Sequence, residues 1–431
     1  DGVVYMGSCD KIIPAMLMAA ARIDLPAALV TAGPCYDEIK PSESKALRAR
    51  FLRGEATERE VIEGTLKYYT GPGVCPFLGT ANTMGCLTEG LGMMLPMGAL
   101  WPSSTSQRRF SARQTGVAVV DLVRRDIKPS DIMTQAALDN AVKLLASVGG
   151  SLNALIHLPA LAHELGLECT WAQVAETTSH TPVVCNVVPN GDISCVNLYK
   201  AGGVPAVLKT IEGDLDTTVM TVTGKTLGEN LAGKIHIDRS VVRTQDDPAS
   251  IANGIQVLYG NLAPEGALVK TSAVPADQHV WSGPAMVFNS EDEAFVAYNE
   301  GRIVAGTGVV IRYEGPKGGP GMKELHRVTE IMKGIPNSAV ITDGRFSGAS
   351  GGLSVGYLCP EALDGAPIAL VEDGDILHVD LTKNLIEVEV SEDEFARRKR
   401  DWKPVIHENG GNLLARYAKQ VGSAKTGAVL A

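Results

Sequence analysis

A thiol, a carboxylate and an amine stand side by side near the start of the chain, at Cys9, Asp10 and Lys11. A cysteine thiolate suits soft metals such as iron or zinc, whereas a carboxylate suits magnesium. Adjacent side chains point to opposite faces of a strand, but they can converge in a tight turn at a helix N-terminus. Such a turn could hold two different metals. The plainer interpretation is a buried cysteine beside a surface ion pair, and the three residues alone favour it because short motifs occur by chance.

Two glycine-rich loops in the second half of the chain also carry polar side chains. The first is RYEGPKGGPGMKE at 312–324, which ends in Glu324, and the second is TDGRFSGASGG at 342–352, which contains Ser347. So much glycine costs conformational entropy on folding. One interpretation is a backbone folded around a small polar ligand, with Glu324 as a ligand of a hard metal and Ser347 facing the pocket. The other is a pair of tight turns at the rim of a barrel, and spacing alone leaves the two interpretations even.

The elements around Cys9 are expected to form a strand, a helix and a second strand. The apolar run VVYM at 3–6 precedes the motif, PAMLMAAARI at 14–23 follows it, and PAALVTAG at 26–33 comes next. This order predicts a βαβ unit and a parallel sheet. A strand-to-helix junction is where such proteins place their chemistry.

Further along, Cys75 lies in a loop rich in Gly and Pro, and a helix is predicted from Thr80 to Leu91. Helices are also predicted over 103–125 and 130–149, and a short strand over 182–188. From about residue 235 closely spaced β-like runs, the first at 235–243, predict a barrel or sandwich. We therefore expect two domains, an α/β domain at 1–240 and a β-barrel domain at 241–431 with a charged helical tail.

Composition excludes several classes of protein. The net charge of −10 and the pI of about 5.4 argue against nucleic acid as a partner, because phosphate binding needs a basic surface. No apolar run is long enough for a membrane span, and no signal peptide is visible. Eight scattered cysteines indicate reduced thiols, hence the cytoplasm or an organelle matrix. The chain opens at Asp1 directly into a predicted strand, and we expect that a segment precedes it.

Four runs together resemble one enzyme family. They are GSCDKIIPAMLMAAARIDLPAALVTAGP, CPFLGTANTMGCLTEGLGMMLP, YEGPKGGPGM and DGRFSG. The chain resembles the dihydroxyacid dehydratase and sugar-acid dehydratase family from Asp1 to about residue 420. The resemblance implies an N-terminal α/β domain, a C-terminal β-barrel domain and a homodimer or a dimer of dimers. It also implies loss of water from a 2,3-dihydroxy carboxylate to give a 2-keto acid.

The resemblance further implies an iron–sulfur cluster held by three cysteines, with one iron left open. Cys9 and Cys75 occupy two of the matching positions, and the third ligand is expected before the start of this chain. A [2Fe–2S] cluster is favoured over [4Fe–4S]. The sulfur atoms of Cys9 and Cys75 should then lie within about 8 Å of each other. Cys35 and Cys86 are expected to be core or pocket thiols and not ligands.

A magnesium ion is implied by the same resemblance. Its ligands correspond to an Asp before the start of this chain, Asp10, a carbamylated Lys11 and Glu324, and its catalytic base corresponds to Ser347. Carbamylation turns the Lys11 amine into an anionic oxygen ligand, whereas an ammonium would repel the metal. An alcohol is a very weak acid, so Ser347 as a base needs a strongly lowered pKa, which the metal charge and loop amides can supply.

Three functions remain open on the sequence. The first is a dihydroxyacid dehydratase of branched-chain amino-acid synthesis, and the second an aldonic-acid dehydratase of sugar catabolism that acts on arabinonate, xylonate or gluconate. A different class is a scaffold without a cluster, since one Cys and one Asp of the expected ligand sets are not in the chain. A zinc hydrolase is weakly supported, because no His/Cys cluster has zinc spacing.

Overall fold

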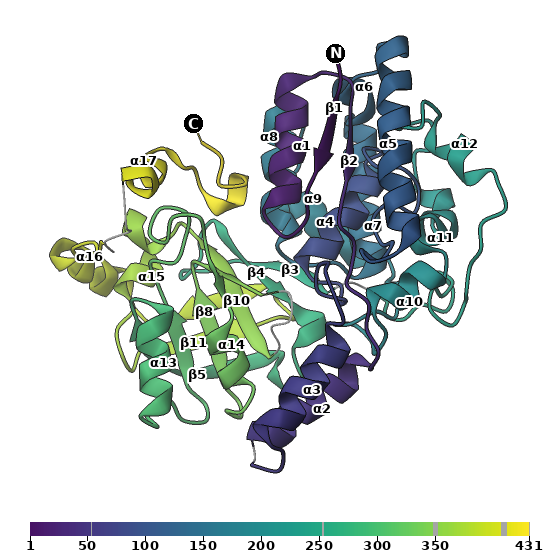
Figure 1. Ribbon diagram of the computed structural model, residues 1–431. Helices are drawn as coiled ribbons and strands as arrows, with labels where there is room; N and C mark the ends of the chain where they lie inside the picture. Colours follow the sequence, from purple (N-terminus) through teal and green to yellow (C-terminus); the bar gives the residue numbers. More distant parts are fainter. Residues whose placement is uncertain (53, 252–253, 348–351, 407–411, 431) are drawn as a thin grey trace. The chain divides into compact units, whose positions relative to one another are not determined.

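The chain divides into two units in the computed structural model (Figure 1). The structure describes all residues except 53, 252–253, 348–351, 407–411 and 431. The first unit comprises 1–154, 161–168 and 177–253, and the second comprises 155–160, 169–176 and 254–431. The domain boundary expected near residue 240 stays a prediction.

Helices dominate the chain up to residue 253. The elements of this part are β1 (Val3–Met6), α1 (Ile12–Ile23), β2 (Ala27–Val30), α2 (Pro41–Leu52), α3 (Glu58–Tyr68), α4 (Thr80–Gly90), α5 (Ser106–Arg125), α6 (Pro129–Ile132), α7 (Gln135–Val148), α8 (Ala154–Leu165), α9 (Trp171–His180), α10 (Cys195–Lys200), α11 (Gly203–Thr210), the 3₁₀ helix η1 (Glu212–Asp214) and α12 (Leu227–Leu231). Residues 155–160 of α8 and 171–176 of α9 belong to the second unit.

The predicted strand–helix–strand start is confirmed. Strands β1 and β2 pair in parallel with Met6 opposite Val30, and β2 is buried throughout. Helix α4 begins at Thr80 as predicted and ends one residue early, at Gly90; ten of its eleven residues are buried. Within the described part of the first unit the parallel sheet has these two strands alone.

Two strands expected near the end of the first unit do not form. The run at 182–188 makes only isolated bridges, such as Cys185 with Val242. The run at 235–243 bends at Asp238, whose side chain accepts hydrogen bonds from the backbone N–H and the hydroxyl of Ser240 at 2.9 and 2.7 Å. Asp and Ser favour such local turns over an extended strand, which explains why the β-like composition of this run did not produce a strand.

The second unit is built around an eight-stranded sheet. Its elements are β3 (Ile255–Leu258), β4 (Gly266–Lys270), η2 (Thr271–Ala273), η3 (Ala276–Gln278), β5 (Val280–Phe288), α13 (Glu291–Asn299), β6 (Gly308–Ile311), β7 (Glu324–Leu325), α14 (Arg327–Met332), β8 (Ala339–Thr342), β9 (Arg345–Phe346), β10 (Leu353–Cys359), η4 (Ala362–Asp364), α15 (Pro367–Leu370), β11 (Ile376–Asp380), β12 (Leu385–Val388), α16 (Glu392–Asp401), α17 (Asn412–Gln420) and η5 (Ala424–Thr426).

This sheet is nearly a closed barrel, as the sequence predicted. The strand order is β12-β11-β5-β6-β8-β10-β4-β3, with parallel pairing from β5 through β10 and antiparallel pairing elsewhere. Tyr259, just after β3, donates its N–H to Asn384 O (2.8 Å) and accepts from the N–H of Ile386 (2.9 Å). This bridge joins the two edge strands, which removes most of the unpaired sheet edge.

The two faces of the sheet carry separate apolar cores. Val310, Ile341 and Val355 belong to the larger core, whereas Val309 and Val340 belong to a core that includes residues of α13 and α14. The alternation along each strand is what a sheet buried on both faces requires. Among the helices that the structure describes, none is both long and apolar enough to cross a bilayer.

Candidate active site

The turn between β1 and α1 holds Cys9 in a left-handed conformation, with φ at +82°. The turn is tied to the end of β2, because the N–H of Gly7 donates to Val30 O (3.1 Å) and the N–H of Ala32 donates to Ser8 Oγ (2.8 Å). Positive φ is uncommon for residues other than glycine, and such backbone strain concentrates at functional sites. The Cys9 thiol is exposed.

Asp10 and Lys11 form an ion pair next to this cysteine. Lys11 Nζ lies 3.3 Å from Asp10 Oδ2, with 55% of the Lys11 side chain and 13% of the Asp10 side chain exposed. An exposed pair of this kind contributes about 0–1 kcal/mol to stability. The pair therefore adds little to the stability of the fold, and its two residues follow Cys9 directly at the N-terminus of α1.

The loop that carries Cys75 is joined to the chain that leaves β2. Pro34 and Val74 form a parallel bridge, the N–H of Cys35 donates to Val74 O (2.8 Å), and the N–H of Val74 donates to Gly33 O (3.0 Å). Because β1 and β2 are parallel, the segments that follow them leave the same edge of the sheet. Cys9 and Cys75 are therefore both carried by loops at that edge.

Asn82 of α4 fixes the same loop from the other side. Its buried side-chain amide donates to the carbonyl oxygens of Cys75 and Phe77, both at 2.8 Å. Two hydrogen bonds from one rigid helix hold the backbone at Cys75 while its thiol stays exposed. The distance between the two sulfur atoms stays a prediction.

Exposure separates these two thiols from the other cysteines. Cys35, Cys86, Cys185, Cys195 and Cys359 are buried, and Cys169 is half-buried. Burial raises the pKa of Cys35 to about 11 and that of Cys185 to about 12. A metal binds the thiolate, so burial opposes ligation at these positions. The expectation that Cys35 and Cys86 are core thiols is confirmed.

In the second unit, the loop at 313–322 folds closely on itself. A Cβ at Gly318 would lie 2.8 Å from Tyr313 Cα, and one at Gly319 would lie 2.9 Å from Glu314 Cα. Only glycine tolerates such approach. The buried carboxylate of Glu361 accepts the backbone N–H of Gly318 at 2.8 Å. Close packing of the loop on itself therefore accounts for two of its glycines.

Two very short strands connect Glu324 with the segment of Ser347. Glu324 in β7 pairs with Arg345 in β9, and Arg345 Nη1 lies 4.0 Å from Glu324 Oε1. The buried Arg345 side chain also donates from Nε to Met322 O at 2.6 Å. Ser347 directly follows β9 and is half-buried. The structure thus brings Glu324 and Ser347 onto neighbouring segments of the second unit.

Buried carboxylates that sequence reasoning missed hold these loops together. Asp343 accepts three backbone N–H groups, from Tyr313 (3.1 Å), Glu314 (3.0 Å) and Ala362 (2.9 Å). Burial raises the pKa of Asp343 to about 6, and burial with the nearby Asp343 charge raises that of Glu361 to about 7. Asp343 lies inside the DGRFSG motif, and a charged residue directly after an apolar strand could have marked it as functional from the sequence. No comparable sequence feature marks Glu361.

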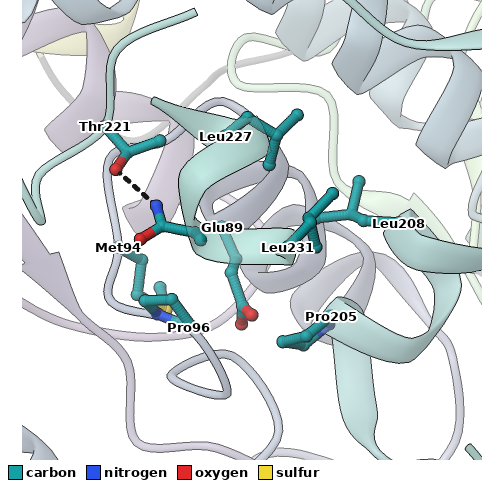
Figure 2. A pocket seen from close by; sticks show the side chains of 9 residues that line it. Glu89, Met94, Pro96, Pro205, Leu208, Thr221, Leu227 and Leu231 are labelled. Atoms are coloured by element: carbon teal, nitrogen blue, oxygen red, sulfur yellow. Dashed lines mark hydrogen bonds between the residues drawn. The ribbon is translucent and has the colours of Figure 1, made fainter. Parts of the chain in front are cut away.

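A separate, largely apolar pocket lies within the first unit (Figure 2). Its walls are mostly Met94, Pro96, Pro205, Leu208, Leu227 and Leu231, with the carboxylate of Glu89 pointing between the two prolines. The Glu89 oxygens accept the backbone N–H groups of Met97 (2.7 Å) and Ala99 (2.9 Å), and burial raises its pKa to about 7. Glu89 therefore anchors the turn at Met97 and Ala99. Apart from its carboxylate, no Cys, Asp, Glu or Lys side chain is among the described residues that line the pocket.

Comparison with known proteins identifies the family. The family model for the dihydroxy-acid/6-phosphogluconate dehydratase N-terminal domain matches residues 1–230, and the model for the C-terminal domain matches 240–428. The chain belongs to this dehydratase family. A dihydroxy-acid dehydratase of Acetivibrio thermocellus is 44% identical over 441 residues, and those of Ruminiclostridium cellulolyticum and Moorella thermoacetica are 43% identical; each alignment covers all of this chain and 80% of the relative.

The dihydroxy-acid/6-phosphogluconate dehydratases are hydro-lyases, and they use an iron–sulfur cluster. The thiols of this chain fit such a cluster in kind, because Cys9 and Cys75 are exposed and held on loops at one sheet edge. Within the described residues, however, no three His, Cys, Asp or Glu side chains gather into a group able to hold a metal ion.

Proposed function

We propose that the chain removes water from a 2,3-dihydroxy carboxylate to give a 2-keto acid, as a dihydroxy-acid dehydratase of branched-chain amino-acid synthesis. The observation that carries the proposal is the match of both family models, which together cover nearly the whole chain, with relatives named dihydroxy-acid dehydratase at 42–44% identity. The residues at the family's motif positions support it.

Cys9 and Cys75 are proposed to bind a [2Fe–2S] cluster, as two of the three thiolates that the family resemblance implies. When bound, the cluster supplies a Lewis acid for the C3 hydroxyl that leaves. Two features support these ligands: both thiols are exposed, and the Cys75 loop is bridged to the chain that leaves β2 at the edge where the Cys9 turn follows β1. The hydrogen bonds from the Asn82 side chain to the backbone at Cys75 and Phe77 restrain the Cys75 loop before any cluster binds.

Asp10, carbamylated Lys11 and Glu324 are proposed as magnesium ligands. The Lys11 amine lies beside a carboxylate and remains exposed, so carbon dioxide has access to it and the product is an oxygen donor next to Asp10. Glu324 is only 30% exposed and lies near Arg345, which orients its carboxylate.

Ser347 is proposed to take the proton from C2 of the substrate. The short strand before it is held by Arg345 and by the N–H of Tyr357, which donates to Gly344 O at 2.8 Å. A base must keep its position to within a fraction of an ångström of its proton. Fixing both strands of the β7–β9 pair restricts where the Ser347 hydroxyl can stand.

The test compares substrates with the iron- and sulfide-loaded protein under anaerobic conditions. We expect a 2-keto acid from 2,3-dihydroxyisovalerate and much less from arabinonate, xylonate or gluconate. The reverse order would assign the chain to the sugar acids, which the family also covers. Bound iron with no product from any of these acids, or no iron uptake after reconstitution, would favour a scaffold without catalysis. We also propose that the protein is a homodimer or a dimer of dimers, and the elution volume of the loaded protein tests this.

A further inference from the structure

Lys270 is a charged residue that the proposed function leaves unexplained. It ends β4, a strand whose other four residues are buried, and it is itself partly buried. Lysines are seldom placed in such surroundings for packing alone. Burial lowers the pKa of the Lys270 amine to about 8, so the side chain can exchange a proton near neutral pH.

The strand register places Lys270 beside the chain that returns from the Ser347 loop. Strands β4 and β10 are antiparallel neighbours, with Val269 opposite Val355 and Leu268 opposite Gly356. One step further along the same register, Lys270 stands opposite Ser354. Directly opposite residues point to the same face of a sheet, so the two side chains share a face.

The same face carries the residue just before Ser347. Ser354 pairs with Val340, and Val340 packs in the core that contains Phe346. The Phe346 ring also lies 3.0 Å from the Cβ position of Gly356. Gly356 is two residues from Ser354, which corresponds to about 7 Å along a strand. A lysine has four methylenes with which to cover that length.

A backbone hydrogen bond ties the two segments together at the other end of the loop. The N–H of Gly352 donates to Ala273 O at 3.0 Å, so the chain re-enters β10 next to the turn that follows Lys270. Only four residues separate Ser347 from Gly352. Phe346, which precedes Ser347, therefore lies against β10, and Gly352 is bonded to the turn that follows Lys270.

The elements next to Lys270 contribute few ionisable side chains. Strand β3 and the turn η2 carry none in their sequences, β10 carries Tyr357 and Cys359, and β9 carries Arg345. Arg345 is directed to Met322 O, and Cys359 stands at the far end of β10 beside Ser423.

Ser347 as a base requires an acceptor for its own hydroxyl proton, because an alcohol is a very weak acid. We propose that Lys270 is the residue that activates Ser347, by accepting the Ser347 hydroxyl proton and then holding the alkoxide with its ammonium. This inference rests on the proposed function. Lys270 acts through Ser347 and is therefore a positioning and activating residue, in the manner of Ser–Lys pairs in other enzymes.

The protons balance over one turnover. The neutral Lys270 amine takes the proton from Ser347 Oγ, and the alkoxide then takes the proton from C2 of the substrate as the C3 hydroxide departs. The ammonium returns its proton to solvent, which restores the amine. Loss of one proton and one hydroxide equals the single water that is removed, and no oxidant or reductant is needed.

The first test measures Lys270 directly and does not depend on turnover. The loaded protein and its Ser347→Ala variant are labelled with trace acetic anhydride between about pH 6 and 10, and acetylation of the Lys270 peptide is followed by mass spectrometry. We expect half-maximal reactivity near pH 8 in the parent. The midpoint should move by about half a pH unit or more in Ser347→Ala, because its neighbour has changed. An unmoved midpoint would overturn the proposal.

The second test separates proton acceptance from positive charge. Lys270→Met and Lys270→Arg should both lower kcat by about 10²-fold or more at unchanged iron content, since guanidinium does not accept a proton. Methylamine should restore part of the activity of Lys270→Ala. Full activity in Lys270→Arg would contradict the acceptor role. If the parent itself makes no keto acid, the proposed function fails, and the labelling result still decides whether Lys270 and Ser347 are in contact.

Discussion

Replacing Lys270 by methionine should stabilise the protein at neutral pH, although most substitutions of partly buried residues destabilise. Burial lowers the pKa of this amine from its usual value of 10.5 to about 8. Each unit of difference corresponds to about 1.4 kcal/mol, so at pH 7 the ammonium costs the folded state about 3 kcal/mol. Methionine keeps a stem of similar length and carries no charge to desolvate.

The pH dependence of this gain has a defined sign. The pKa of Lys270 is lower in the folded state, so between about pH 8 and 10.5 the unfolded chain binds more protons and parent stability rises with pH. The advantage of Lys270→Met should fall from about 3 kcal/mol at pH 7 to about 2 kcal/mol at pH 9. Residual solvent contact makes these values upper limits.

Urea unfolding of the parent and of Lys270→Met at pH 7 and pH 9, followed by far-UV circular dichroism, measures the difference. The exposed Lys425 lies in the same unit, and Lys425→Met serves as the matched control that should change little at either pH. A loss of stability of equal size at both pH values would refute the reasoning, because it would mean that the Lys270 ammonium is not desolvated. A gain in stability joined to a loss of turnover would show that this lysine is retained for function.

Other outcomes follow from the same contacts. Ser347→Ala should abolish keto-acid formation at unchanged iron content, and retained activity would exclude it as the base. Cys9→Ser should lower bound iron after reconstitution, whereas Cys169→Ser, at a half-buried thiol that is not a proposed ligand, should not. Gly318→Ala should lower the urea midpoint, because the added Cβ would meet Tyr313 Cα at 2.8 Å. Because the pKa of Asp343 is raised, the stability of the parent should fall as the pH rises from about 4 to 6, and Asp343→Asn should flatten this fall.

Helices and strands could be predicted where the apolar pattern of a segment and the turn residues beside it indicate the same element. The order of β1, α1 and β2, and the start of α4 at Thr80, followed from apolar runs and from the loop before them. The prediction of a strand at 235–243 was wrong, because the turn at Asp238 outweighs the β-branched residues around it. The nearly closed barrel was expected from many short runs, but the bridge from Tyr259 to β12 depends on residues more than a hundred positions apart.

The candidate site was harder to predict than the fold, because its supports are buried charges far apart in sequence. Asp343 and Glu361 join three loops through backbone N–H groups, and a sequence shows only single acidic residues there. Backbone donors lower the pKa of these carboxyls while burial raises it, and burial dominates, so each carboxylate costs stability at neutral pH. Desolvation of the Lys270 ammonium also lowers stability at neutral pH, in this case for a positive charge. Two buried carboxyls beside the segments of Glu324 and Ser347, and a partly buried amine that we propose acts on Ser347, are difficult to explain by stability, and they are what a site that must hold and exchange protons requires.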